Sequence, residues 1–430
     1  MSNENNQKGS WLAIAIMFML FFMIAFVTNC AGSMGIPLEQ QFGESASQYG
    51  SSANFFAYLF MGIPGGLILK RKGYKFTALL AVAIGVLGLM VQIVACYLPA
   101  GMGVLVTYIS GAFIAGFSMC LLNLVVNPLL NTLGGGGNKG NQLVQFGCSL
   151  NSIGATLAPI ILGNLIANGN AKAQFVDAVP ALGVAIGIFV VAFIVLALSK
   201  IPEPHLETAE EKANRTSVVA DILSTLKFRH FTLGAIAIFC YITIESGIPN
   251  FMNLYMSKAG SEGYVGTAIA GSVVGAYWFC MMIGRLCGGA IGGKVSSRTQ
   301  ITVCSILGIA FMLATMFIPV KMFSVSIACG DWSWSLKFPL AMVFGVLCGL
   351  CTSVMWGGIF NMAAEGLGKY VPVGAGIFMS MVFGGMLLNG QAWLAKITGY
   401  LNSYWMTIAL FAYVLFYALI GSRVSKRADA

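Results

Sequence analysis

Apolar stretches long enough to cross a lipid bilayer recur along the whole chain. About 20 apolar residues in a helix span a hydrocarbon core of roughly 30 Å. Twelve such stretches lie at 11–36, 47–69, 76–97, 103–131, 140–168, 178–199, 231–256, 264–293, 299–319, 336–364, 371–397 and 402–422. This pattern predicts an all-α integral membrane protein with 12 transmembrane helices.

One long polar segment divides the twelve stretches into two sets of six. The two sets also repeat, because GSSANFFAYLFMGIPGGLILKRKGYK (from Gly50) and GSVVGAYWFCMMIGRLCGGAIGGKVSSR (from Gly271) both pass aromatics, reach a glycine pair and end in basic residues. Repeated halves are typical of transporters whose substrate site lies between them at the bilayer midplane. We therefore predict two six-helix bundles, at 1–199 and 231–430, joined by a cytoplasmic linker at 200–230.

Composition excludes a soluble protein. Hydrophobic residues make up 58% of the chain and charged residues 9%, and the mean hydropathy is +0.85. A soluble domain carries roughly 25% charged residues, because its surface must be hydrated. The apolar stretch from Trp11 has no small-residue cleavage site, so it predicts a retained first helix and not a removed signal peptide.

The basic residues predict the orientation in the membrane. The net charge is +9, but the basic residues lie in short loops between the apolar stretches, which argues against a nucleic-acid partner. With the N-terminus in the cytoplasm, 18 of the 23 Lys and Arg residues fall on the cytoplasmic side and 5 on the other. We predict a monomer in the bacterial cytoplasmic (inner) membrane, with both termini cytoplasmic and the lipid bilayer as a partner.

Glu245 is the acidic residue that lies deepest in an apolar stretch. It follows Phe231 by 14 residues, about 21 Å along a helix that rises ~1.5 Å per residue. An ionisable side chain at this depth is costly and is a candidate for function. Burial disfavours its charged form, so Glu245 is the candidate proton-coupling residue. The alternative is a structural carboxyl bonded to a neighbouring helix.

Gly247 and Pro249 follow Glu245 within the same stretch. Glycine and proline at this depth free backbone polar groups, which is tolerated only where protein or a wet cavity satisfies them. The pattern fits either a discontinuous helix that lines a substrate path or a simple packing kink.

Amide, hydroxyl and aromatic side chains gather at matching depth in the two halves. Amides that face a cavity, with aromatic rings to stack on apolar sugar faces, suit a neutral polyhydroxylated ligand. The alternative for any one of them is hydrogen bonding between helices, which is common in membrane bundles. The candidate substrate-binding residues are Asn29, Ser33, Asn54, Asn123, Asn127, Gln142, Gln145, Tyr241, Trp278, Trp356 and Phe360.

The sequence holds no pattern of an enzyme. It has no phosphate-binding loop, no metal spacing and no nucleophile elbow, and its two histidines lie in the linker, so we expect no catalytic residue, metal or cofactor. The cysteines, including Cys348 and Cys351, fit small packing residues. Basic residues at the ends of spans two and eight, which are Lys70, Arg71 and Arg285, are candidates to brace a cytoplasmic gate or to lie among lipid headgroups.

Several motifs in order resemble one family. The chain is similar to the fucose–proton symporter family, the fucose/glucose/galactose permease branch of the major facilitator superfamily. The motifs are IPGGLILKRKGYK (from Ile63), LNSIGATLAP (from Leu150), YITIESGI (from Tyr241), GAYWFCMMIGRLCGG (from Gly275) and EGLGK (from Glu365). They lie in both halves, so the resemblance covers nearly the whole chain, and it implies sugar uptake driven by protons.

Three positions depart from that family. Its aspartate in span one falls on Ser33, its acidic residue or glutamine in span four falls on Asn123, and its glutamine in span five falls on Cys148. Proton coupling, if kept, would then fall on Glu245.

The leading hypothesis is a secondary active transporter that takes up a monosaccharide or sugar derivative by proton symport. The alternative is an uncoupled or sodium-coupled facilitator or exporter of a related small polar solute. A membrane sensor on a transporter scaffold would need a signalling domain, for which the tails and the linker are too short. A membrane enzyme would need an acid–base or metal cluster.

Overall fold

The fold is known from a computed structural model. It describes 2–33, 38, 41–42, 49–167, 175–204, 206, 217–257, 260–329 and 332–424. Within these ranges, the side chains of 2–10, 27–33, 158–167, 267–268, 325–329 and 332–336 are not described.

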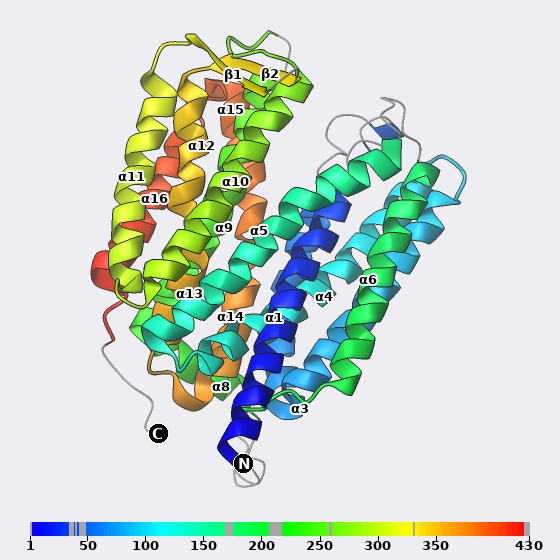
Figure 1. The fold of residues 1–430 in the computed structure, drawn as a ribbon, viewed down its shortest axis with the longest axis vertical. Coiled ribbons are helices and arrows are strands. Elements are labelled where there is room, and N and C mark those ends of the chain that lie inside the picture. The colour runs from blue at the N-terminus through cyan, green and yellow to red at the C-terminus, as the bar shows by residue number, and fades with distance from the viewer. Residues whose placement is uncertain are drawn as a thin grey trace.

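Five long helices form the first half of the described chain (Figure 1). Their apolar sequences favour helices in lipid, because a helix satisfies its own backbone hydrogen bonds. These elements are α1 (Ser2–Ser33), α3 (Tyr49–Cys96), α4 (Met102–Leu133), α5 (Gly137–Ala167), the short η2 (Phe175–Ala178) and α6 (Val179–Leu198).

The second half follows a short helix, α8 (Val218–Leu226). Its elements are α9 (Arg229–Ser257), α10 (Thr267–Gly292), α11 (Ser297–Phe317), β1 (Met322–Cys329), β2 (Trp332–Pro339), α12 (Ala341–Thr352), α13 (Met355–Ala364), η3 (Gly368–Tyr370), α14 (Val371–Ser380), η4 (Met381–Met386), α15 (Leu387–Thr398), α16 (Tyr404–Phe416) and η5 (Tyr417–Gly421).

The helices confirm the predicted fold class. Among the described residues, nine helical segments are long and apolar enough to cross a membrane, and one of them, α3, contains two predicted spans. The shorter apolar helix in α1 and the amide-rich α5 account for the other two of the twelve.

The two halves meet along two seams. Helix α5 packs against α10, and α3 packs against α14. Figure 1 shows the two groups of helices closest near the chain termini and diverging toward the β1–β2 end. At the second seam, a Cβ on Gly66 would lie 2.6 Å from the carbonyl oxygen of Pro372, and one on Gly62 would lie 2.5 Å from that of Gly376. Only glycine lets the backbones approach this closely.

The predicted break in span seven is wrong. Helix α9 runs from Arg229 to Ser257 as one helix and keeps Pro249 inside it, which contradicts the interpretation as a discontinuous helix. The interruptions lie instead in spans ten and eleven. Span ten divides into α12 and α13 around Val354, and span eleven passes through the 3-10 segment η4.

A β-hairpin joins α11 to α12 where the sequence predicts a loop. Strands β1 and β2 pair antiparallel, from Met322 with Pro339 to Cys329 with Trp332. The segment alternates small polar and large apolar residues, as in FSVSIA and WSWSLKF, which is a strand pattern. The hairpin therefore takes the first residues that the hydropathy had assigned to span ten.

A linker residue, Glu203, binds the turn between the two spans of α3. Gly73 turns the chain between the two spans in α3, with φ 85° and ψ 177°. The carboxylate of Glu203 accepts hydrogen bonds from the backbone N–H groups of Tyr74 and Lys75, the latter at 2.9 Å. These donors begin the second span of α3, so Glu203 acts as a helix cap from a distant segment.

A second contact holds the linker helix in place. The Nζ of Lys70 lies 2.9 Å from Asp221 Oδ2, an ion pair between the end of span two and α8. Lys75 donates from Nζ to the carbonyl oxygens of Ala197 and Ser199, each at 2.8 Å, at the end of α6. Lys70, a predicted gate residue, thus binds the linker helix, and Lys75 binds the end of α6.

Gly73→Ala is expected to lower the free energy of unfolding by about 1–3 kcal/mol, the cost of a conformation that only glycine adopts readily. The added Cβ would also collide with the Glu203 carboxylate. The measurement is the apparent melting temperature of the purified protein in detergent.

The matched control is Gly103→Ala, because Gly103 lies in α4 and a Cβ there meets no atom within 4 Å. That variant is expected to be neutral or slightly stabilising. Equal melting temperatures for the two variants would contradict the role given to Gly73.

Candidate functional site

A buried ion pair lies between helices α9 and α10. Arg285 donates from Nη2 to Glu245 Oε1 at 2.9 Å. Arg285 is 5% exposed and the Glu245 side chain 16%. Two charges in a protein interior are tolerated only when each is paired and hydrogen-bonded. Glu245 is therefore not an isolated carboxyl, as its position in the sequence alone would suggest.

Arg285 also contacts the opposite half. Its Nη1 donates to Ser152 Oγ at 2.6 Å and to the carbonyl oxygen of Cys148 at 3.1 Å, both on α5. One guanidinium thus connects α9, α10 and α5. The structure does not place Arg285 among lipid headgroups. The sequence carried a signal for this position, because Arg285 lies eight residues inside the end of the predicted span 264–293.

A chain of hydrogen bonds crosses between the halves beside the ion pair. Asn123 donates from Nδ2 to the hydroxyl of Tyr58 at 3.1 Å. Asn127 donates from Nδ2 to Asn123 Oδ1 at 3.3 Å and accepts at Oδ1 from Trp356 Nε1 at 2.8 Å. The chain joins α3 and α4 of the first half to α13 of the second.

Aromatic side chains connect Trp356 to the ion pair. The Trp356 and Tyr241 rings lie 6.3 Å apart between centroids. Tyr241 is fully buried and lies one helical turn before Glu245 on α9. Tyr277 donates its hydroxyl to the backbone carbonyl of Glu245 at 3.1 Å. Polar and aromatic groups from both halves therefore converge around Glu245, a group that we call the central cluster.

Other candidates lie at the edges of this cluster. Trp278 packs against Tyr277 with ring centroids 5.3 Å apart. Phe360 packs edge-on against Phe378 at 5.2 Å. Gln145 donates from Nε2 to the carbonyl oxygen of Val354 at 3.0 Å, where span ten divides.

The remaining candidates lie elsewhere or outside the described side chains. Asn54 is buried in the α3–α4 seam, where its carbonyl oxygen would lie 2.8 Å from a Cβ on Gly116. Gln142 lies beside Gly292 at the end of α10. Arg71 is exposed beside Lys70. The side chains of Asn29 and Ser33 fall outside the described residues.

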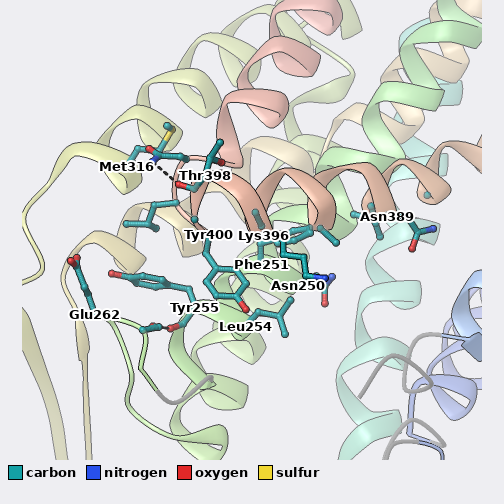
Figure 2. A pocket seen from close by; sticks show the side chains of 18 of the residues that line it. Asn250, Phe251, Leu254, Tyr255, Glu262, Met316, Asn389, Lys396, Thr398 and Tyr400 are labelled. Atoms are coloured by element: carbon teal, nitrogen blue, oxygen red, sulfur yellow. Dashed lines mark hydrogen bonds between the residues drawn. The ribbon is translucent and has the colours of Figure 1, made fainter. Parts of the chain in front are cut away.

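A cavity of about 980 Å³ lies between the halves at the end of the molecule opposite the termini. Its walls include the end of α9, helix α15, the turn before α16 and the start of α3, as Figure 2 shows in part. Its lining contains none of the predicted substrate-binding residues. Asn250, Asn389 and Tyr400 line the cavity but are not among the residues that the sequence predicts for substrate binding, because no local sequence pattern joins them.

Comparison with known proteins identifies relatives over nearly the full length. The family model of the Major Facilitator Superfamily matches residues 11–388. The glucose/galactose transporter of Brucella abortus biovar 1 (strain 9-941) is 27% identical over 440 residues, covering 98% of this chain and 97% of that protein. The L-fucose-proton symporter of Escherichia coli (strain K12) is 21% identical over 445 residues, covering 96% and 94%.

Solved structures share the fold. A Major Facilitator Superfamily transporter, FucP, in the outward conformation superposes with a TM-score of 0.78 at 17% identity, covering 96% of this chain and 99% of that one. The proton:xylose symporter XylE, bound to 6-bromo-6-deoxy-D-glucose, gives a TM-score of 0.69 at 12% identity, with 96% and 95% covered.

Arg285→Met is expected to destabilise the protein by about 3–5 kcal/mol, because it leaves the Glu245 carboxylate buried without a partner. The double variant Arg285→Met/Glu245→Gln removes both charges and is expected to recover most of that loss. Denaturant unfolding of the purified protein in detergent measures both.

Lys294→Met is the control, since Lys294 is an exposed cation just beyond the end of the same helix. Its effect should stay within about 0.5 kcal/mol. If the single and double Arg285 variants proved equally unstable, the charge pairing would not be the cause.

Proposed function

The chain belongs to the Major Facilitator Superfamily, and from this premise we propose that it is a secondary transporter that takes up a monosaccharide by proton symport. It is a multi-pass membrane protein and not an enzyme. One relative is named as a glucose/galactose transporter and another as an L-fucose-proton symporter. These names support a sugar as the substrate and a proton as the coupling ion. No cofactor is needed for this activity.

The observation that carries the proposal is the contact of Arg285 with Glu245 and α5 together. With Glu245 ionised, Arg285 is held between the second half and Ser152 of the first. A proton on Glu245 removes the charge that holds the guanidinium. The contacts of Arg285 with α5 then weaken, and the seam between α5 and α10 becomes free to open. Proton binding thereby couples to the separation of the halves.

Sugar binding acts on the neighbouring hydrogen bonds of the central cluster. The bond from Trp356 Nε1 to Asn127 Oδ1 joins the halves at 2.8 Å. A sugar hydroxyl can accept from the indole and donate to the amide, so the ligand can replace this bond without leaving either group unpaired. Trp356 and Tyr241 offer ring faces for the apolar side of the sugar. Asn123, Gln145 and Trp278 complete the proposed site, and Asn29 would complete it from α1.

The orientation and assembly are part of the same proposal. Both termini face the cytoplasm of a bacterium and the protein acts as a monomer in the inner membrane. The basic-residue asymmetry supports this orientation. So does the linker helix α8, which binds Lys70 and lies at the end where the termini are (Figure 1). Residues 1–199 and 231–430 move as two bundles about the site, joined by the linker at 200–230.

One observation favours an alternative, an uncoupled facilitator or exporter. Glu245 Oε1 lies 2.9 Å from Arg285 Nη2, in a direct ion pair. If that pair never breaks, Glu245 is structural, and the sugar moves down its gradient without a proton. A sodium-coupled carrier would need carboxylate oxygens free for the ion, and Arg285 occupies one of those of Glu245.

The variant Glu245→Gln distinguishes a proton symporter from an uncoupled facilitator. In proteoliposomes with glucose, galactose or L-fucose, the wild-type protein should accumulate one of these sugars above equilibrium when the outside is acidic. The variant should exchange labelled for unlabelled sugar but should not concentrate it, because the amide cannot carry the proton. Uptake with a proton gradient, with a sodium gradient and with neither measures the coupling.

Asp177→Asn is the control, since Asp177 is an exposed acid in η2 that does not line the cavity, and it should keep concentrative uptake. Wild-type uptake that stops at equilibrium under every gradient would point to the facilitator. Concentrative uptake by Glu245→Gln would exclude Glu245 as the proton carrier.

A further inference from the structure

The cavity of about 980 Å³ is separate from the central cluster and has its own polar lining. Its amides come from three elements, Asn250 on α9, Asn389 on α15 and Asn402 before α16. Ser51 and Ser52 add hydroxyls from α3, in the other half. Donors and acceptors from both halves thus face one partly open cavity.

Aromatic rings and balanced charge complete the lining. Figure 2 shows Tyr400 reaching from the turn after α15 toward Leu254 and Asn250 of α9, with Tyr255 beside it. The charged residues in the lining are Glu262 and Lys396, one acid and one base. Because the two charges offset each other, the cavity favours neither anions nor cations. Hydroxyls, amides and ring faces without net charge suit a neutral sugar.

The size of the cavity indicates loose binding. A volume of about 980 Å³ lies at the upper end of the range for small-molecule sites, roughly 300–1,000 Å³. A single monosaccharide fills only part of this space, so it would touch a few of the polar groups at a time and keep part of its hydration. Such a site binds weakly and exchanges its ligand quickly.

Phe55 lies in the wall of this cavity, about one helical turn of α3 from a member of the central cluster. It lines the cavity from α3, together with Gly385 of η4 in the opposite half. A Cβ on Gly385 would lie 2.8 Å from the Phe55 ring, so the ring is seated directly on this backbone. Tyr58 lies about one helical turn further along α3, and its hydroxyl accepts a hydrogen bond from Asn123. Phe55 thus contacts the cavity on a helix that, about one turn further on, reaches the amides.

We propose that the cavity is an outer binding site for the transported sugar, and that Phe55 against Gly385 is the gate between it and the central cluster. This proposal rests on the proposed function. Sugar binds first among Asn250, Asn389 and Tyr400, and it passes to the central cluster when Phe55 leaves Gly385. The outer site raises the concentration of sugar at the gate, so it acts on the apparent affinity for uptake and not on the turnover rate.

Equilibrium binding and uptake kinetics test the outer site. The full-length protein in detergent is titrated with radiolabelled glucose, galactose and L-fucose in turn, and wild type should show a tight and a weak class of sites. Tyr400→Ala should remove the weak class and raise the KM for uptake about fivefold with kcat unchanged, the effect of one lost hydrogen bond of roughly 1 kcal/mol. Asn389→Ala, an exposed position on α15, is the second variant.

Two controls separate this test from the test of transport itself. Trp393→Ala removes an aromatic that is 65% exposed on α15 and is not part of the cavity lining, so it should leave both classes unchanged. Trp356→Ala should remove the tight class and keep the weak one. A single class that is lost in Trp356→Ala and untouched in Tyr400→Ala and Asn389→Ala would overturn the outer site while transport stands. No sugar binding by the wild-type protein would overturn both proposals.

Discussion

A charge inside a membrane protein must have a partner, and this structure meets that constraint with one arginine. Arg285 reaches Glu245 on α9 and two oxygens on α5, so the pairing that makes the carboxylate tolerable also connects the two halves. The Arg285 side chain therefore both compensates the charge of Glu245 and helps to hold the two halves together. Any event that alters the charge of Glu245 has to alter the contact between the halves as well.

The neutral groups around the ion pair follow a related logic. Asn123, Asn127 and Trp356 satisfy one another across the halves, because an unpaired amide at this depth costs free energy. Their bonds are individually modest, and a ligand rich in hydroxyls can take them over one by one. A site of this kind is held closed by its own hydrogen bonds when empty. It can therefore exchange internal bonds for bonds to a sugar at little net cost.

Much of the fold could be predicted from the sequence, because lipid forces the hydrophobic pattern to follow the helices. The functional site was harder to predict from the sequence. Glu245 stood out by its depth, but its partner lies 40 residues away on another helix, and no local pattern joins the two. Pro249 suggested a broken helix, yet α9 is continuous through it, while the divisions near Val354 and in η4 carry no proline. The outer cavity depends on Asn250, Asn389 and Tyr400 meeting in space, which sequence spacing does not reveal.

The glycine seam between α3 and α14 has a mechanical consequence. At Gly62 and Gly66 the main chain of one half rests on the main chain of the other, at Gly376 and Pro372. Main-chain atoms have no rotamers, so the spacing there stays fixed while side chains elsewhere rearrange. Such a seam can serve as a fulcrum. A small tilt about it is magnified with distance along the helices, opening one mouth of the protein by the same motion that closes the other.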